Sequence, residues 1–224
     1  DVLKCYLRAN KDNSVKLILV DNSRIKSIVK ESFFDYEDII QFKTKFRCKS
    51  IALNKAIEYH CKFDNDFIIC LDNDVEFNNN FIVKYLNSVK SESYNYYYGT
   101  ALNVIKPKSA HQLWYYHFLQ GSQKGKKDEG FYKSEKMMFY GCSFGFYYKY
   151  WKKVRGFDHR FGPGSKFNLG SQESTFQKKL KHKGYKPFLI KNNPITHRPL
   201  EKSYKIKYVL KRVSRNGRTH GFES

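Results

Sequence analysis

The sequence contains few cysteines, the residues that form disulfides or bind structural metals in small proteins. Its 224 residues include five prolines, two tryptophans and only five cysteines, at positions 5, 48, 61, 70 and 142. The cysteines form no CxxC pair, which argues against a zinc ribbon or a thioredoxin-like redox site. Their odd number, their apolar surroundings and the lack of an N-x-S/T sequon favour reduced thiols. We therefore predict a reducing, cytoplasmic location.

Long hydrophobic runs and acidic residues are also scarce. No apolar stretch approaches the roughly 18 residues of a membrane-spanning helix, and no signal-peptide pattern opens the chain. The 21 Asp and Glu residues stand against 42 Lys and Arg, a formal charge of +21. Such a charge attracts nucleotides, anionic lipid surfaces and nucleic acid. With 41% hydrophobic residues, the chain is long enough for one domain with a substantial core.

An apolar run that ends on carboxylates is the most informative stretch of the chain. Residues 67–71 (Phe-Ile-Ile-Cys-Leu) predict a buried strand of a parallel sheet, and Asp72 and Asp74 follow it. Open α/β sheets bind ligands beyond the carboxyl ends of their strands. Two carboxylates there suit magnesium or manganese, which bridge proteins to substrate phosphates. The alternative is an ordinary Asp/Asn turn after a strand.

A second acidic strand end supports the metal-site interpretation. Residues 16–20 predict another apolar strand, which runs into Asp21 and Asn22. Between the two strands, apolar residues recur at helical spacing over residues 48–57. The right-handed crossover rule then places both acidic ends on one edge of one sheet. The predicted fold class is α/β, with a mixed, mostly parallel sheet flanked by helices.

These patterns resemble the family 2 glycosyltransferases, nucleotide-sugar enzymes of the GT-A fold. Residues 19–23 (Leu-Val-Asp-Asn-Ser) are similar to the strand end that contacts the donor base, and residues 47–54 to the helix start that lines the nucleotide pocket. Residues 71–74 (Leu-Asp-Asn-Asp) resemble the DxD motif. The resemblance implies a divalent cation, Mn²⁺ or Mg²⁺, with Asp74 as its direct ligand. It assigns donor binding to Asp21, Asn22, Arg47, Asn54 and Asp72.

The second half of the chain extends the resemblance. Gln172 and Glu173 occupy the place of the family's Glu-Asp helix start, which implies Glu173 as the catalytic base. The alternative is a helix-start acid that the helix dipole stabilises. Residues 194–197 are similar to the strand end whose histidine completes the metal shell. His197 is therefore the second expected metal ligand, with a surface turn as the alternative.

The resemblance covers residues 3–197, and both ends of the chain differ from the family pattern. The family opens with a strand that nothing before Val15 resembles, and residues 1–10 predict the helix that follows such a strand. We expect an N-terminally truncated GT-A domain over residues 1–200. Residues 201–224 predict a basic helix or tail, which either lies on an anionic membrane surface or packs its apolar stripe on the domain.

Two further segments are candidates for acceptor contacts. Residues 120–135 predict a long polar loop that is either a lid or a surface insertion. The aromatic cluster at residues 114–118 either stacks on an acceptor sugar or fills the core.

The resemblance implies a metal-dependent, inverting, hexosyltransferase-like enzyme of polysaccharide biosynthesis. It would move a sugar from a nucleotide-sugar donor to a saccharide or lipid-linked acceptor, peripheral to a membrane in the second case, with no nucleic-acid partner. One alternative is a basic nucleic-acid-binding protein, although the chain has no recognisable helix-turn-helix, RNP or zinc pattern. The other is a catalytically inactive sugar-binding relative.

Overall fold

The structure, a computed structural model, describes residues 2–11, 15–22, 36–91, 94–103, 109–110, 141–190, 192–198 and 205–223. All the predicted site residues lie in these ranges. The predicted lid at residues 120–135 and the aromatic cluster at residues 114–118 lie outside the described residues.

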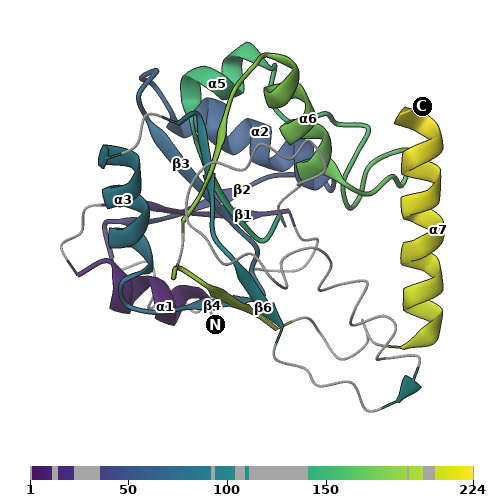
Figure 1. Cartoon of the computed structure of the whole chain (residues 1–224), viewed down its shortest axis with the longest axis horizontal. Helices are drawn as coiled ribbons and strands as arrows, with labels where there is room; N and C mark the ends of the chain where they lie inside the picture. Colours follow the sequence, from purple (N-terminus) through teal and green to yellow (C-terminus); the bar gives the residue numbers. More distant parts are fainter. Residues whose placement is uncertain are drawn as a thin grey trace.

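Six helices are described in order along the chain (Figure 1). They are α1 (Val2–Ala9), α2 (Lys49–His60), α3 (Phe81–Ser91), α5 (Tyr148–Lys153), α6 (Gln172–His182) and α7 (Ile206–Glu223). The strands between them are β1 (Leu17–Asp21), β2 (Ile39–Lys43), β3 (Phe67–Leu71), β4 (Val75–Phe77), β5 (Tyr96–Tyr98), β6 (Ala101–Asn103), β7 (Ser143–Tyr147), β8 (Pro187–Leu189) and β9 (Ile195–His197). The helices expected at residues 1–10 and 48–57 and the strand expected at residues 67–71 are confirmed.

The strands form three hydrogen-bonded ladders, with the orders β1-β2, β3-β7-β5-β8 and β4-β9-β6. β3 pairs antiparallel with β7, and β5 pairs antiparallel with β7 but parallel with β8. The mixed sheet is therefore confirmed. The prediction that residues 67–71 form a strand of a parallel sheet is wrong, because β3 pairs antiparallel with β7, and parallel pairs do not predominate among the described strands. The expectation that β1 and β3 share one sheet is wrong, because β1 pairs in parallel with β2, a strand that the apolar pattern did not single out.

The central sheet carries apolar side chains into a core on each of its faces. Tyr97 of β5 joins the core formed with α1 and α3, whereas its neighbours Tyr96 and Tyr98 join the core formed with α2, α5 and α6. Successive side chains of a strand point to opposite faces of a sheet. Helices consequently cover both faces, as the view along the molecule's shortest axis shows (Figure 1).

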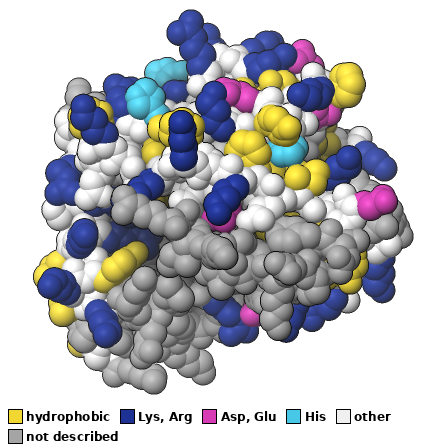
Figure 2. Space-filling view, turned by 180° about the vertical axis from the view of Figure 1, so that it is seen from behind, with side chains coloured by type: hydrophobic (Ala, Val, Ile, Leu, Met, Phe, Trp, Pro, Cys, Tyr) yellow, Lys and Arg dark blue, Asp and Glu magenta, His cyan; other side chains and the backbone are white. Residues whose placement is uncertain are grey.

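The C-terminal helix α7 stands at the edge of the molecule (Figure 1). It contacts the rest of the chain through Val209, which is 1% exposed, and through Thr219, whose hydroxyl accepts a hydrogen bond from the Gly170 N–H at 2.8 Å. Ile206 and Leu210 are exposed. Lys and Arg side chains are spread over the opposite face of the molecule, with few Asp or Glu among them (Figure 2). Among the described helices, none is long and apolar enough to cross a membrane.

Candidate active site

Asp72 and Asp74 lie in the short connection between β3 and β4. The N–H of Asp72 donates to the carbonyl of Cys142 at 3.2 Å, which ties this connection to the start of β7. The antiparallel register of β4 with β9 pairs Val75 with His197. It brings Nε2 of His197 to 3.3 Å from Oδ2 of Asp74. His197 therefore lies in a paired strand, and the surface-turn alternative does not hold.

Two carboxylate oxygens and an imidazole nitrogen, from Asp72, Asp74 and His197, lie within 4.8 Å of one another. Ligands that bind a cation at about 2.1 Å are at most about 4.2 Å apart, so the three atoms need to close by only about half an ångström. Carboxylates suit Mg²⁺ and Mn²⁺, and imidazole is an accepted ligand of divalent transition metals. The residues present therefore fit a divalent cation of this kind.

His197 also affects the protonation of its neighbour. Burial acts to raise the pKa of Asp74, but the hydrogen bond and the charge of His197 outweigh it, so the pKa of this carboxyl lies below its usual range. Asp74 is therefore ionised at neutral pH. An ionised carboxylate is the form that ligates a metal.

Lys49 links the expected metal site to the expected base. Its ammonium lies 2.5 Å from Oδ1 of Asp72 and 3.3 Å from Oε1 of Glu173, and the three side chains are only 20–28% exposed. Burial disfavours the charged form of Lys49, but the two carboxylates outweigh it and raise the pKa of Lys49. Burial raises the pKa of Asp72, Lys49 acts against this rise, and Glu173 adds to it.

Glu173 is the second residue of α6, where the helix dipole favours a negative charge. Its side chain packs directly against Gly141: a Cβ atom added to Gly141 would lie 2.1 Å from Cγ and 2.5 Å from Oε1 of Glu173. Gly141 thus leaves the space that the Glu173 side chain occupies.

Gln172 departs from the acid that the family resemblance places before the base, and the structure gives a reason for an amide there. The side chain is 1% exposed, and its Oε1 lies 3.2 Å from the Ser50 hydroxyl. A glutamate at this position would bury a charge that is costly without a close cation. The neutral amide avoids the cost of a buried charge, but its Nε2 has no hydrogen-bond partner within the described part of the chain.

The remaining predicted donor residues form two separate groups. Asn22, directly after β1, donates from Nδ2 to the carbonyl of Arg47 at 2.9 Å, and Asp21 accepts a hydrogen bond from Gln41 at 3.3 Å. Arg47 itself is exposed. This group therefore joins the end of β1 to the segment that enters α2, two residues before Lys49.

Asn54 lies one and a half turns into α2 and is engaged with the backbone. Its Nδ2 donates to the carbonyl of Phe157 at 2.7 Å, and its Oδ1 accepts the N–H of Phe157 at 2.9 Å. The amide thus ties α2 to the loop after α5. The structure brings Asp72, Asp74, His197 and Glu173 together and gives Asn54 a positioning contact at some distance along the helix.

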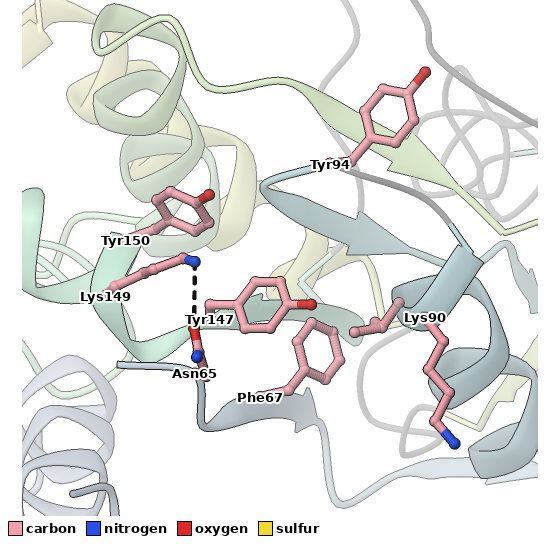
Figure 3. Close-up of a pocket in the computed structure, with 8 residues that line it drawn as sticks. Asn65, Phe67, Lys90, Tyr94, Tyr147, Lys149 and Tyr150 are labelled. Atoms are coloured by element: carbon pink, nitrogen blue, oxygen red, sulfur yellow. Dashed lines mark hydrogen bonds between the residues drawn. The ribbon is translucent and has the colours of Figure 1, made fainter. Parts of the chain in front are cut away.

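A pocket of about 530 Å³ opens at the other end of β3 (Figure 3). Lys149 lies in it with its ammonium 5.1 Å and 5.3 Å from the ring centroids of Tyr147 and Tyr150. Phe67, which lines the pocket, begins β3, whereas Asp72 follows its last residue. Five strand residues span about 16 Å, so this pocket is separate from the carboxylate site.

The sequence matches a known protein family over more than half of its length. Residues 2–155 match the profile described as Glycosyl transferase family 2. The chain belongs to glycosyl transferase family 2. No curated protein matches the sequence. The matched range ends before α6 and β9, so the roles of Glu173 and His197 in this family 2 glycosyltransferase depend on geometry and resemblance.

Solved structures similar to this family 2 chain share its fold at low sequence identity. TarS of S. aureus (residues 1–349) has a TM-score of 0.64 at 10% identity, over 98% of this chain and 68% of that structure. The mannosyltransferase PcManGT of Pyrobaculum calidifontis, in complex with GDP-Man and Mn²⁺, has a TM-score of 0.63 at 12% identity, over 95% and 56%. GalNAc-T7 with UDP, GalNAc and Mn²⁺ gives 0.57 at 13%, over 89% and 41%. The GT-A fold is therefore confirmed, and the chain spans between two fifths and two thirds of these structures.

Sequence reasoning missed the roles of two residues in the candidate site, Lys49 and Gly141. A signal for Lys49 was present, because a cation in the first turn of the helix predicted at residues 48–57 opposes the helix dipole and so indicates a partner elsewhere. Gly141 begins a small-residue segment, residues 141–146, that is similar to the family, but nothing in that segment indicated a contact with Glu173. Its contact with Glu173 comes from α6, 32 residues further along the chain.

Proposed function

We propose that the chain transfers a sugar from a nucleotide-sugar donor to a hydroxyl of a saccharide or lipid-linked acceptor, by a metal-dependent, inverting reaction. The observation that carries the proposal is the cluster of Asp72, Asp74 and His197, which Lys49 joins to Glu173 through its ion pairs with Asp72 and Glu173. Membership of glycosyl transferase family 2 supports glycosyl transfer over the nucleic-acid-binding alternative. The Mn²⁺ and nucleotide-sugar in the PcManGT complex support the choice of ligands.

The proposed roles follow from chemistry. Asp74 and His197, with Asp72 beside them, would hold a divalent cation that neutralises charge on the leaving nucleoside diphosphate. Asp21, Asn22 and Arg47 would bind the nucleotide part of the donor, and Asn54 would act there by holding the adjoining loop.

Glu173 is the proposed general base. In the reaction, the acceptor oxygen forms a bond to the anomeric carbon while the bond from that carbon to the phosphate oxygen breaks. The acceptor proton passes to the Glu173 carboxylate, and the nucleoside diphosphate leaves with the bonding electrons. Attack from the face opposite the leaving group inverts the anomeric configuration. Gly141 has no side chain and so leaves room for the Glu173 carboxylate.

We infer that α7 adds a weak contact with an anionic lipid surface that carries the acceptor. Ile206 and Leu210 lie one turn apart on one face and are 50% and 60% exposed. Four cations accompany them, at Lys205, Lys207, Lys211 and Arg212. Each cation near an anionic surface contributes about 1 kcal/mol, and salt screens the contribution.

This contact is tested by sedimentation with anionic vesicles at low and high salt. The parent should sediment at low salt only, and a variant with the four cations changed to alanine should stay in solution. A parent that stays in solution at low salt would restrict α7 to packing on the domain, which its buried Val209 already provides.

A donor screen followed by two substitutions tests the glycosyl-transfer proposal. Thermal shift with Mn²⁺ and a panel of UDP- and GDP-sugars identifies the donor, because a ligand that binds the native state raises its stability. Asp74→Ala should then abolish the Mn²⁺-dependent shift. Glu173→Gln should keep it but lower turnover by roughly two to four orders of magnitude, since the amide cannot accept the proton.

Matched controls lie on the surface. Asp64, which pairs with Lys152, and Glu58, which pairs with Lys55, are 62% and 47% exposed, so Asp64→Ala and Glu58→Gln should behave like the parent. Normal turnover by Asp74→Ala would remove the metal site from the mechanism. A parent that binds the donor but neither transfers nor hydrolyses it would be the inactive sugar-binding relative.

A further inference from the structure

We infer that Lys49 is an internal counter-cation of the active site, which lowers the affinity of the Asp72, Asp74 and His197 cluster for a divalent cation and holds Glu173 in position. The inference rests on the proposed metal site. Lys49 acts against cation binding. Removal of its charge should therefore raise the affinity of the cluster for the cation, whereas removal of a metal ligand should lower it.

Three elements that are distant in the sequence meet at the Lys49 ammonium. Lys49 begins α2, Asp72 follows β3 and Glu173 lies in the first turn of α6. Its ammonium is 2.5 Å from Asp72 and 3.3 Å from Glu173. One cation therefore bridges a carboxylate of the metal cluster and the carboxylate of the proposed base.

The stability of α2 does not explain why a lysine stands at its first residue. A cation at the N-terminus of a helix is unfavourable, because the dipole places partial positive charge there. The first turn of α2 contains no acidic residue that would offset this. The two carboxylates from outside the helix are thus what stabilises Lys49 where it lies.

Lys49 and a divalent cation would share the Asp72 carboxylate. A metal at about 2.1 Å from an oxygen of Asp72 would lie about 5 Å from the ammonium, given the 2.5 Å ion pair. Two like charges at that distance repel even in water. For a divalent and a monovalent cation, the repulsion corresponds to roughly a tenfold change in affinity. Removing the Lys49 charge should therefore tighten cation binding.

Removing the Lys49 charge should also lower turnover, through its effect on Glu173. Glu173 loses the cation that orients its carboxylate in the absence of acceptor, and a misplaced base lowers turnover strongly. The combination of tighter cation binding with slower turnover separates this role from a general structural defect, which would weaken both.

The experiment measures Mn²⁺ affinity directly, from the electron paramagnetic resonance signal of free Mn²⁺, in parent, Lys49→Met and Lys49→Arg proteins without donor. Lys49→Met should bind Mn²⁺ roughly tenfold more tightly than the parent, and Lys49→Arg, which keeps the charge, should bind like the parent. Lys55→Met is the matched control, since Lys55 lies in the same helix and pairs with Glu58 on the surface. Its Mn²⁺ affinity should equal that of the parent.

Mn²⁺ binding by Lys49→Met that is unchanged or weaker overturns the inference. Failure of both the parent and the variant to bind Mn²⁺ also overturns it. If circular dichroism shows Lys49→Met to be unfolded, Lys49→Gln carries the same expectation, because its amide still donates to a carboxylate without a charge. Donor turnover is measured separately. A tenfold tighter Mn²⁺ affinity in a protein without any transferase activity would sustain the role of Lys49 and reject the proposed function.

Discussion

Gly141→Ala tests whether the position of the Glu173 carboxylate matters for catalysis. The added methyl group would lie 2.1 Å from Cγ, 2.2 Å from Cδ and 2.5 Å from Oε1 of Glu173. Carbon atoms in contact are about 3.5–4.0 Å apart, so the Glu173 side chain must retreat by roughly 1.4 Å or more. Gly141 is not among the residues with positive φ, so alanine fits the backbone.

The size of the effect follows from the displacement. Misplacing a reacting group by about 1 Å can cost a hundredfold in rate, and the retreat here exceeds that distance. We expect the turnover number of Gly141→Ala to fall about a hundredfold. The atoms that must move belong to a flexible side chain that is 20% exposed, so global stability should change little. Donor affinity should be nearly unchanged, because the metal cluster is not touched.

Steady-state kinetics with the identified donor, donor titration by calorimetry and thermal unfolding measure the three quantities separately. Gly217→Ala is the control, since a Cβ at Gly217 in α7 would have nothing within 4 Å. Turnover by Gly141→Ala within about twofold of the parent would refute the reasoning, because the methyl group cannot enter without moving Glu173. A large loss of thermal stability would instead show that the backbone, and not the carboxylate, had yielded.

Two more predictions concern stability. Asn54→Ala leaves both backbone groups of Phe157 without the amide that pairs them, so the free energy of unfolding in urea should fall by about 1–3 kcal/mol; unchanged stability would return Asn54 to a donor-binding role alone. Asp158 pairs with Arg160 at 2.6 Å. Burial acts to raise the pKa of Asp158, but the hydrogen bonds from Arg160 outweigh it and the pKa is lowered. The pair therefore stabilises the fold above about pH 4, the ordinary Asp value, and this contribution is lost as the pH falls through the lowered pKa. The unfolding free energy should decline more steeply with acid in the parent than in Asp158→Asn, and equal slopes measured by urea titration would contradict the assignment.

The positions of strands and helices could be predicted from the sequence because their signals are local. The apolar run at residues 67–71 and the helical spacing at residues 48–57 depend on neighbouring residues only, and both match β3 and α2. Pairing between strands was less readable. The crossover rule assumes that β1 and β3 lie in one sheet, whereas a weakly patterned strand, β2, pairs with β1.

The sequence alone was enough to predict an α/β protein that resembles a glycosyltransferase, with acidic strand ends and candidates for the metal ligands and the base. How those residues meet depends on the tertiary structure. The register of β4 with β9 brings His197 to Asp74. Side-chain contacts between the first residues of α2 and α6 bring Lys49 to Glu173, 124 residues away. The charge and size of a side chain can be read at a single position of the sequence. The residue that neutralises that charge depends on which helices and strands pack together in the fold.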